Sequence, residues 1–310
     1  MFSVVIPYYK KLQYIERCLD SVLNQTFKEF EIVLVDDGSE DELKELISKK
    51  YLNKVKIISQ KNQGVSAARN TGIVNSSKQY IAFLDADDYW SPFYLEKNAE
   101  IINKENSVQM IGSHYSSFKE NVEQQDLTLT YFPIKNYFKI GIPNTMFFTS
   151  ATIVNNNFFK NNKGFNPSLK YGEDLDIWFR AILEGGKIFF IDNTLVYYSV
   201  EDLFQATRKK ANLADTISGQ AFDLYSKFLH RKDFSVFLSK YLYINLARSY
   251  YSLENHKTAS NVLKKIPNKF FLAQLYFQMP FTLGKFLFKK DSVKKMGRKY
   301  MKFLFLKIYN

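Results

Sequence analysis

The first part of the chain alternates between strand-like and helix-like segments, and no other feature constrains the fold as strongly. Short runs rich in β-branched and aromatic residues are separated by segments with apolar residues at helical spacing. The strand-like runs are residues 2–9, 30–39, 54–60 and 79–85. Strands that alternate with helices indicate βαβ units and a mainly parallel sheet. We therefore predict an α/β domain over residues 1–200.

The remainder of the chain, residues 201–310, shows only helix-like patterns. Within it, residues 245–266 resemble one tetratricopeptide-type helix pair, with the small residues Ala247 and Ala259. One such unit cannot form a solenoid, so we predict a helical hairpin. The second predicted part is thus an all-helical C-terminal region.

Acidic side chains follow two of the strand-like runs. Asp36 and Asp37 end the second run, and Asp85, Asp87 and Asp88 end the fourth. In an open parallel sheet, ligands bind beyond the carboxyl ends of the strands. We therefore expect the two acidic groups to lie close together at one edge of the sheet.

The three carboxylates after the fourth run favour a bound cation. Like charges so close in sequence repel each other, and burial strengthens the repulsion. Mg²⁺ and Mn²⁺ prefer oxygen ligands, and Mg²⁺ usually combines one or two carboxylates with substrate phosphates. The alternative is an Asp-rich turn that caps the helix after it.

The turn after the second run, Asp36-Asp37-Gly38-Ser39, has two possible functions. One Asp can accept hydrogen bonds from a base or a ribose, and an Asx turn can begin the next helix. We expect both, with Ser39 as the helix cap. The chain contains neither the glycine motif of dinucleotide-binding folds nor a P-loop, which argues against a nicotinamide site.

Five motifs resemble, in their order, the inverting family 2 glycosyltransferases with the GT-A fold, of the bacterial surface-polysaccharide type. The motifs are VVIPYY, VLVDDGS, NQGVSAARNTG, FLDADD and GED, within residues 1–200. The resemblance implies a metal-dependent enzyme that moves a sugar from a nucleotide-sugar, often a UDP-sugar, to a hydroxyl of a saccharide or lipid-linked saccharide. The Q-x-x-R-W motif of processive synthases is absent, so we expect transfer of a single sugar.

The resemblance also implies residues that bind the donor. Tyr9 matches the position that packs against the base, and Pro7 shapes that turn. Asp37 matches the acid that reads the base. Arg69 matches a basic residue that contacts the donor, and Asp85 is the first acid of the D-x-D pair. Lys10 stands where the family often has Asn, so that loop is expected to differ.

Metal binding and catalysis are implied for other acids. Asp87 matches the ligand of a divalent cation, Mn²⁺ or Mg²⁺, that bridges the donor diphosphate. Asp88 is an extra acid that can replace Asp87 as the ligand. Asp174 matches the general base, and the preceding Glu173 is open to a catalytic role or to a stabilising position at a helix N-terminus.

Two further residues follow on the same predicted helix. Trp178 can stack on an acceptor sugar or belong to the core. Asp176 is expected to be a surface or structural residue.

The C-terminus is strongly basic. The whole chain has a formal net charge of +12. Residues 281–310 hold nine Lys and Arg against one acid, Asp291. Val293, Met296, Tyr300 and Leu304 recur there at helical spacing, which indicates a basic amphipathic helix. Such a helix suits an anionic membrane surface or docks on the protein with its lysines in water.

The charge and the 17% of aromatic residues also suggest another class, a nucleic-acid-binding protein. The basic residues lie away from the acidic motifs, and an acidic cleft repels a phosphate backbone, so we expect no nucleic-acid partner. A third alternative is a sugar-nucleotide-binding protein without activity. One cysteine, Cys18, and no signal peptide or long apolar run favour a cytoplasmic protein, with peripheral attachment to the inner face of the cell membrane as a further expectation.

Overall fold

The structure is a computed structural model that describes residues 1–310 except 41–42, 52, 123–127, 143–145, 202–211 and 310. The chain forms two compact units. The first consists of Met1–Lys135, Met146–Pro167 and Asp174–Gln205, and the second of Asn136–Thr145, Ser168–Glu173 and Ala206–Asn310. Two short segments from before residue 200 therefore group with the second unit.

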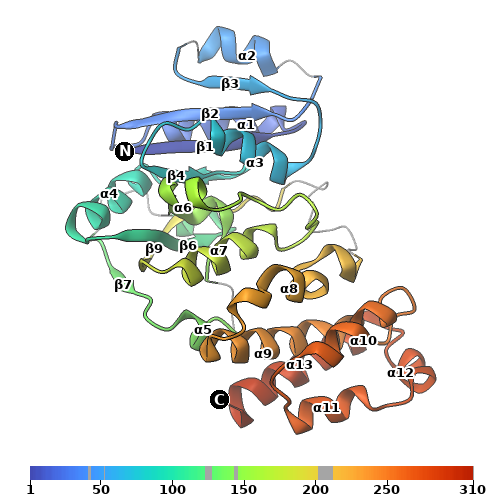
Figure 1. The fold of residues 1–310 in the computed structure, drawn as a ribbon. Coiled ribbons are helices and arrows are strands. Elements are labelled where there is room, and N and C mark those ends of the chain that lie inside the picture. The colour runs from blue at the N-terminus through green and yellow to red at the C-terminus, as the bar shows by residue number, and fades with distance from the viewer. Residues whose placement is uncertain (41–42, 52, 123–127, 143–145, 202–211, 310) are drawn as a thin grey trace. The chain divides into compact units, whose positions relative to one another are not determined.

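Parallel strands form one half of the sheet in the first unit (Figure 1). They are β3 (Lys56–Ser59), β2 (Phe30–Asp36), β1 (Phe2–Tyr8) and β4 (Tyr80–Phe83), in this spatial order. All three pairings are parallel. The strand–helix alternation of the sequence thus predicts this half correctly.

The other half of the sheet is mixed. Strand β8 (Thr152–Asn155) lies antiparallel between β4 and β6 (Val108–Ser116). Strand β9 (Lys187–Tyr197) runs parallel to β6, and β5 (Tyr89–Trp90) and β7 (Tyr131–Pro133) pair with β9 in antiparallel fashion. The predicted α/β class with a mainly parallel sheet is confirmed, with a mixed second half.

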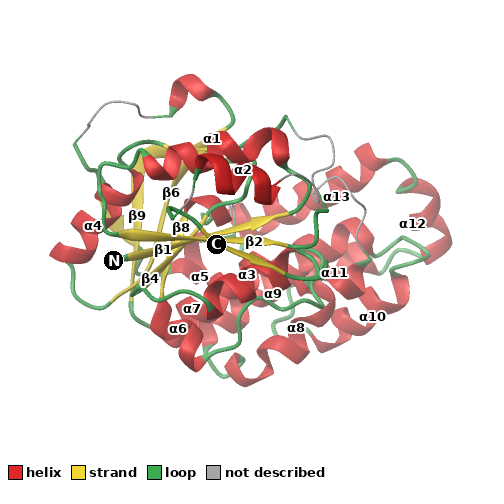
Figure 2. Ribbon diagram, turned by 90° about the horizontal axis from the view of Figure 1, so that it is seen from above, coloured by secondary structure: helices red, strands yellow, loops and turns green. Residues whose placement is uncertain are grey.

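Helices cover both faces of this sheet (Figure 2). The helices of the first unit are α1 (Leu12–Leu23), α2 (Leu43–Lys50), α3 (Val65–Val74), α4 (Tyr94–Lys104), α6 (Asn156–Asn161) and α7 (Glu173–Glu184). Side chains alternate between the two faces along a strand, so Val4 joins the core under α1, α2 and α4, while Val5 faces α3. Gly72 permits the close contact on that side, because a Cβ there would lie 2.3 Å from Val5.

The second unit is helical. Its helices are α5 (Tyr137–Ile140), α8 (Ile217–Tyr225), α9 (Lys232–Ser249), α10 (His256–Lys265), α11 (Phe271–Phe277), α12 (Phe281–Leu287) and α13 (Asp291–Phe303), followed by a π-helical turn (Leu304–Ile308). The predicted hairpin is present as α9 and α10, with Ala247 and Ala259 buried. None of the described helices is both long and apolar enough to cross a membrane.

Helix α13 leaves part of its predicted apolar stripe exposed. Of its described residues, Gly297 and Met301 are buried, as is Leu304 in the turn that follows, and the helix packs against α9. Met296 and Tyr300, predicted to share a face with Leu304, are exposed instead. The predicted amphipathic helix is thus present, with part of its apolar stripe left exposed.

Candidate active site

The predicted acidic groups do meet at one edge of the sheet. The registers of β1 with β2 and β4 place Tyr8 beside Asp36, and the Asp85–Asp88 turn just beyond the end of β4. Because β8 runs antiparallel to β4, the 3₁₀ turn that precedes it, Thr149–Ala151, lies at the same edge. The edge therefore collects groups from four segments that are distant in sequence.

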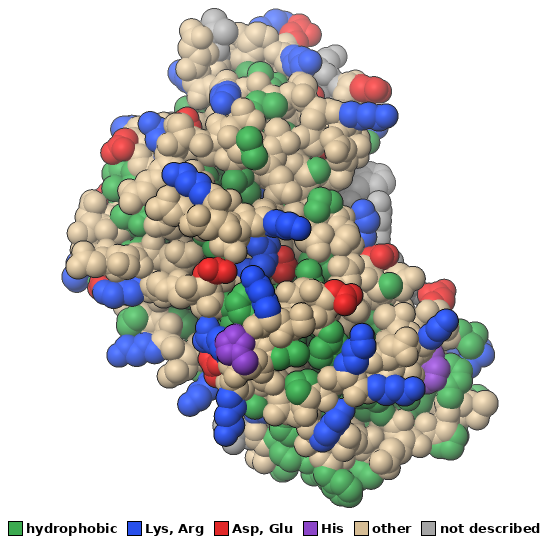
Figure 3. Space-filling view, viewed as in Figure 1, with side chains coloured by type: hydrophobic (Ala, Val, Ile, Leu, Met, Phe, Trp, Pro, Cys, Tyr) green, Lys and Arg blue, Asp and Glu red, His purple; other side chains and the backbone are tan. Residues whose placement is uncertain are grey.

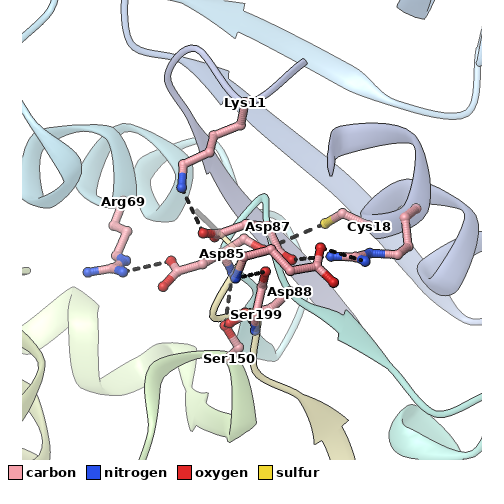
Figure 4. A network of polar contacts seen from close by, with 10 residues as sticks. Lys11, Cys18, Arg69, Asp85, Asp87, Asp88, Ser150 and Ser199 are labelled. Atoms are coloured by element: carbon pink, nitrogen blue, oxygen red, sulfur yellow. Dashed lines mark hydrogen bonds and ion pairs between the residues drawn. The ribbon is translucent and has the colours of Figure 1, made fainter. Parts of the chain in front are cut away.

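Asp85 and Asp87 of the turn each have a basic partner (Figure 4). Arg69 of α3 lies with Nη2 2.7 Å from Asp85 Oδ1. Lys11, just before α1, lies with Nζ 2.7 Å from Asp87 Oδ2. The sequence predicted the role of Arg69 on the donor but missed Lys11, whose only signal was a basic residue directly after the first strand.

Asp88 has a different environment. It is buried, and its carboxylate accepts hydrogen bonds from Ser150 Oγ at 2.6 Å and from the backbone N–H of Ser199 at 2.8 Å (Figure 4). Burial, and then the charges of Asp85 and Asp87, raise the pKa of Asp88 well above its usual range. These contacts tie the acidic turn to the segments before β8 and after β9.

Asp85 and Asp87 have the oxygen ligands that a divalent cation prefers. Among the described residues, no group of three or more His, Cys, Asp and Glu side chains is placed to hold a metal ion. Burial raises the pKa of Asp87, while Lys11 lowers it. A partly buried carboxylate gains from added positive charge, and Mg²⁺ needs only one or two carboxylates when the substrate brings phosphates.

Helix α1 contacts the Asp85–Asp88 turn through two side chains. Arg17 Nη2 donates to the backbone oxygen of Asp87 at 3.0 Å. Its guanidinium also lies 5.2 Å and 5.3 Å from the ring centroids of Tyr89 and Tyr197, which stack on each other. Cys18 is buried, with Sγ 3.8 Å from the backbone oxygen of Asp85. Nothing in the sequence indicated these long-range contacts.

The residues predicted to bind the base lie at the ends of β1 and β2. Pro7 is part of β1, and the following Tyr9 is exposed. Asp37 is buried and accepts hydrogen bonds from the backbone N–H groups of Gln63 at 2.9 Å and Gly64 at 2.7 Å. Its carboxylate therefore fixes the loop that leads into α3.

Asp36 and Ser39 shape the turn beside Asp37. Asp36 accepts the backbone N–H of Ser39 at 3.0 Å, which is the hydrogen bond of an Asx turn. Ser39 Oγ in turn accepts the N–H of Lys10 at 3.1 Å, so it links the first two strand ends.

Asp174 lies in the first turn of α7. Its Oδ1 accepts the N–H of Leu175 at 2.7 Å, and its Oδ2 accepts the hydroxyl of Thr149 at 3.3 Å. Thr149 is the chain neighbour of Ser150, which holds Asp88. The predicted base and the acidic turn are thus connected through two adjacent residues.

Comparison with known proteins decides the family. The family model of glycosyl transferase family 2 matches residues 3–161, which is just over half of the chain. The chain belongs to this family. An uncharacterized glycosyltransferase of Rickettsia typhi is 29% identical over 239 residues, which cover 74% of this chain and 72% of the relative.

Solved structures show the same fold. TarS of Staphylococcus aureus, residues 1–349 in complex with UDP-GlcNAc, aligns over 98% of this chain and 91% of its own, with a TM-score of 0.70 and 19% identity. The mannosyltransferase PcManGT of Pyrobaculum calidifontis, in complex with GDP-Man and Mn²⁺, covers 96% of this chain and 87% of its own, with a TM-score of 0.58 and 13% identity. This family 2 glycosyltransferase therefore has the predicted GT-A architecture.

Two residues of α7 are structural in this glycosyltransferase. Asp176 has a side chain only 2% exposed and pairs with Arg180 Nη2 at 2.7 Å, so it belongs to the buried structure. Trp178 is fully buried, with ring centroids 6.3 Å from Phe83 and 6.4 Å from Phe147. Of the two alternatives for Trp178, the core position is the correct one.

Proposed function

We propose that this glycosyltransferase is a metal-dependent inverting enzyme that moves one sugar from a UDP-sugar to a hydroxyl of a saccharide or lipid-linked saccharide in surface-polysaccharide synthesis. One observation carries the proposal: Asp174 and the acids Asp85 and Asp87 lie at one sheet edge, joined through Thr149 and Ser150. The nucleotide-sugar complexes of TarS and PcManGT, and the Mn²⁺ in the latter, support the donor class and the metal.

Asp85 and Asp87 would hold the divalent cation, with Asp88 keeping the turn in place. When bound, the cation stabilises negative charge on the leaving diphosphate as a Lewis acid. Arg69 is next to Asp85 and adds fixed positive charge on the same side. Tyr9 packs on the base, Pro7 sets the direction of its turn, and the loop held by Asp37 lines the base site.

Asp174 acts as the general base. The acceptor oxygen attacks the anomeric carbon from the face opposite the nucleotide and forms the new C–O bond, while its proton passes to Asp174. The bond between the anomeric carbon and the diphosphate oxygen breaks, and the nucleoside diphosphate leaves with the electron pair. Attack from the opposite face inverts the anomeric carbon.

The second unit supports action at the cytoplasmic face of a membrane. Phe271, Phe286, Met296 and Phe303 are exposed on α11, α12 and α13, with Phe286 77% exposed. The rings of Tyr276 and Tyr300 stack at 6.4 Å, which places α11 and α13 side by side. Figure 3 shows hydrophobic side chains among Lys and Arg over this part of the molecule.

An anionic lipid surface fits this face better than a second copy of the chain. Lys295, Arg298 and Lys299 are exposed beside the apolar side chains of α13. Two such surfaces would repel each other, whereas acidic headgroups attract them and acyl chains accept the phenyl rings. We therefore propose peripheral membrane binding, which would bring a lipid-linked acceptor to the enzyme.

A donor screen tests the proposed function. Hydrolysis of UDP-glucose, UDP-galactose, UDP-GlcNAc and UDP-GalNAc is measured with Mn²⁺, with Mg²⁺ and with EDTA, and UDP binding is measured by calorimetry. We expect metal-dependent binding of UDP that Asp87→Asn weakens in Mn²⁺ but hardly changes in EDTA. Equal affinity for UDP with and without metal would exclude the metal role. A rise in the melting temperature with an oligonucleotide, but not with UDP and Mn²⁺, would favour the nucleic-acid alternative.

A further inference from the structure

An aromatic cluster lies at the same edge of the sheet as the acids. It consists of Tyr115 near the end of β6, Phe148 before the 3₁₀ turn, and Tyr198 directly after β9. The ring centroid of Phe148 is 4.5 Å from that of Tyr115 and 4.9 Å from that of Tyr198. The Tyr115 side chain is 46% exposed, while Phe148 and Tyr198 are half-buried.

The cluster is connected to the active site on two sides. Phe148 precedes Thr149, whose hydroxyl donates to Asp174. Tyr198 precedes Ser199, whose N–H donates to Asp88. Each half-buried ring is therefore one residue away from a group that holds an active-site acid.

The order of strands separates this cluster from the donor residues. Along the sheet edge, β2 and β1 carry the residues assigned to the base, and β4 carries the acids. Next come β8, preceded by Thr149, and then β6 and β9, which carry Tyr115 and Tyr198. The acids thus lie between the aromatic cluster on one side and the residues assigned to the nucleotide base on the other.

We propose that these three rings form the binding platform for the acceptor sugar, an inference that rests on the proposed function. One face of a pyranose ring presents C–H groups, and the negative face of an aromatic ring attracts them. Binding sites commonly combine such apolar rings with a few polar groups, and the phenol hydroxyls of Tyr115 and Tyr198 can serve sugar hydroxyls. A sugar stacked there would have its ring beside Asp174.

A simple core explanation accounts for only part of the cluster. Phe148 packs against the main hydrophobic core and needs no ligand. Tyr115 gains little from the core, because nearly half of its side chain stays in water. An exposed ring that packs against half-buried rings, one residue from groups that hold the active-site acids, suits a sugar-binding platform.

The test uses methyl glycosides as probes with the intact protein. Saturation-transfer NMR is recorded with methyl β-D-glucoside, β-D-galactoside and β-D-N-acetylglucosaminide in the presence of UDP and Mg²⁺. We expect saturation of ring protons in the wild type, a large loss in Tyr115→Ala and Tyr115→Leu, and retention in Tyr115→Phe. With the best glycoside as acceptor, KM should rise about tenfold in Tyr115→Ala, as expected for one aromatic contact.

Controls separate this proposal from the proposed function. Phe132→Ala removes an exposed ring on β7 and should leave the saturation unchanged. UDP–Mg²⁺ affinity reports on folding and on the donor site. If UDP binds normally and the glycosides show no saturation in the wild type, or the same saturation in Tyr115→Ala, the platform is wrong while the donor site stands. If UDP does not bind, the proposed function fails, and the platform fails with it.

Discussion

The active-site edge and the surface of the C-terminal helices use charge in opposite ways. At the edge, Asp85 and Asp87 are each held by a basic partner at 2.7 Å. On α13, Lys295 and Lys299 extend into water beside exposed apolar side chains. Burying a charge is costly unless it is paired, whereas an exposed charge costs little and is screened by salt.

This difference matches the role proposed for each region. Buried and paired charges are fixed in position, as a site requires if it is to stabilise charge that develops during a reaction. Exposed lysines have no single geometry, but they attract an extended anionic surface. Changes at the edge should therefore alter rate or stability strongly, and changes on α13 should alter binding in a salt-dependent manner.

The largest effect is expected from Asp174→Asn, which removes the proton acceptor and keeps the size of the side chain. Loss of a general base typically lowers kcat by about 10²–10⁴-fold. Donor affinity should change little, because the base acts in the transition state. Transfer is measured by UDP release, beside calorimetry with UDP and Mn²⁺.

Glu184→Gln is the matched control for Asp174→Asn, since Glu184 is exposed at the far end of the same helix. If Asp174→Asn keeps near-wild-type turnover while Glu173→Gln loses it, Asp174 is not the general base.

The next effect concerns stability and compares a buried with an exposed ion pair. Asp176→Asn breaks the buried pair with Arg180 and should lower the free energy of unfolding by about 3 kcal/mol. Asp233→Asn breaks the exposed pair with Arg231 and should cost at most about 1 kcal/mol. Urea unfolding measures both, and equal losses would contradict the contrast between buried and exposed charges.

A smaller effect is expected from replacing Lys295, Arg298 and Lys299 by Gln. Each basic residue near an anionic surface contributes about 1 kcal/mol, so binding to vesicles with acidic lipids should weaken by about a hundredfold. The control replaces Lys54, Lys160 and Lys163, exposed lysines of the first unit, and changes net charge equally. If both triple variants lose vesicle binding equally at low salt, overall charge and not the α13 surface is responsible.

The smallest effect sharpens the role of Lys11. Its ammonium must leave Asp87 before a cation binds there, and a charged hydrogen bond contributes about 1.5–3 kcal/mol. Lys11→Met should therefore bind Mn²⁺ about tenfold more tightly without nucleotide, as measured by paramagnetic resonance of free Mn²⁺. Lys10→Met is the control, and weaker Mn²⁺ binding in Lys11→Met would show that Asp87 is not a ligand.

Local patterns predicted the first half of the sheet and the position of the acidic turn. Each βαβ unit between β1 and β4 joins segments that are close in sequence, so spacing and turn residues are sufficient. The insertion of β8 between β4 and β6 could not be predicted this way. Its position depends on pairing with strands distant in sequence.

The candidate site divides along the same line. The motif identified Asp85, Asp87 and Asp174 as residues of interest, because acids at strand and helix ends are visible in a single stretch of sequence. It could not tell whether Asp87 or Asp88 is the better candidate ligand. The two acids differ because Ser150 and Ser199, from far along the chain, donate hydrogen bonds to Asp88.

By itself, the sequence determined the α/β class, the family resemblance and the edge of the sheet at which the acids lie. The tertiary structure alone decided which acid faces Lys11, which is buried, which rings gather around Phe148 and which face of α13 packs on α9. The physical reason is that strand and helix periodicity is set by neighbours in the chain. Partners of buried charges and rings are set by packing between elements, which one stretch of sequence does not encode.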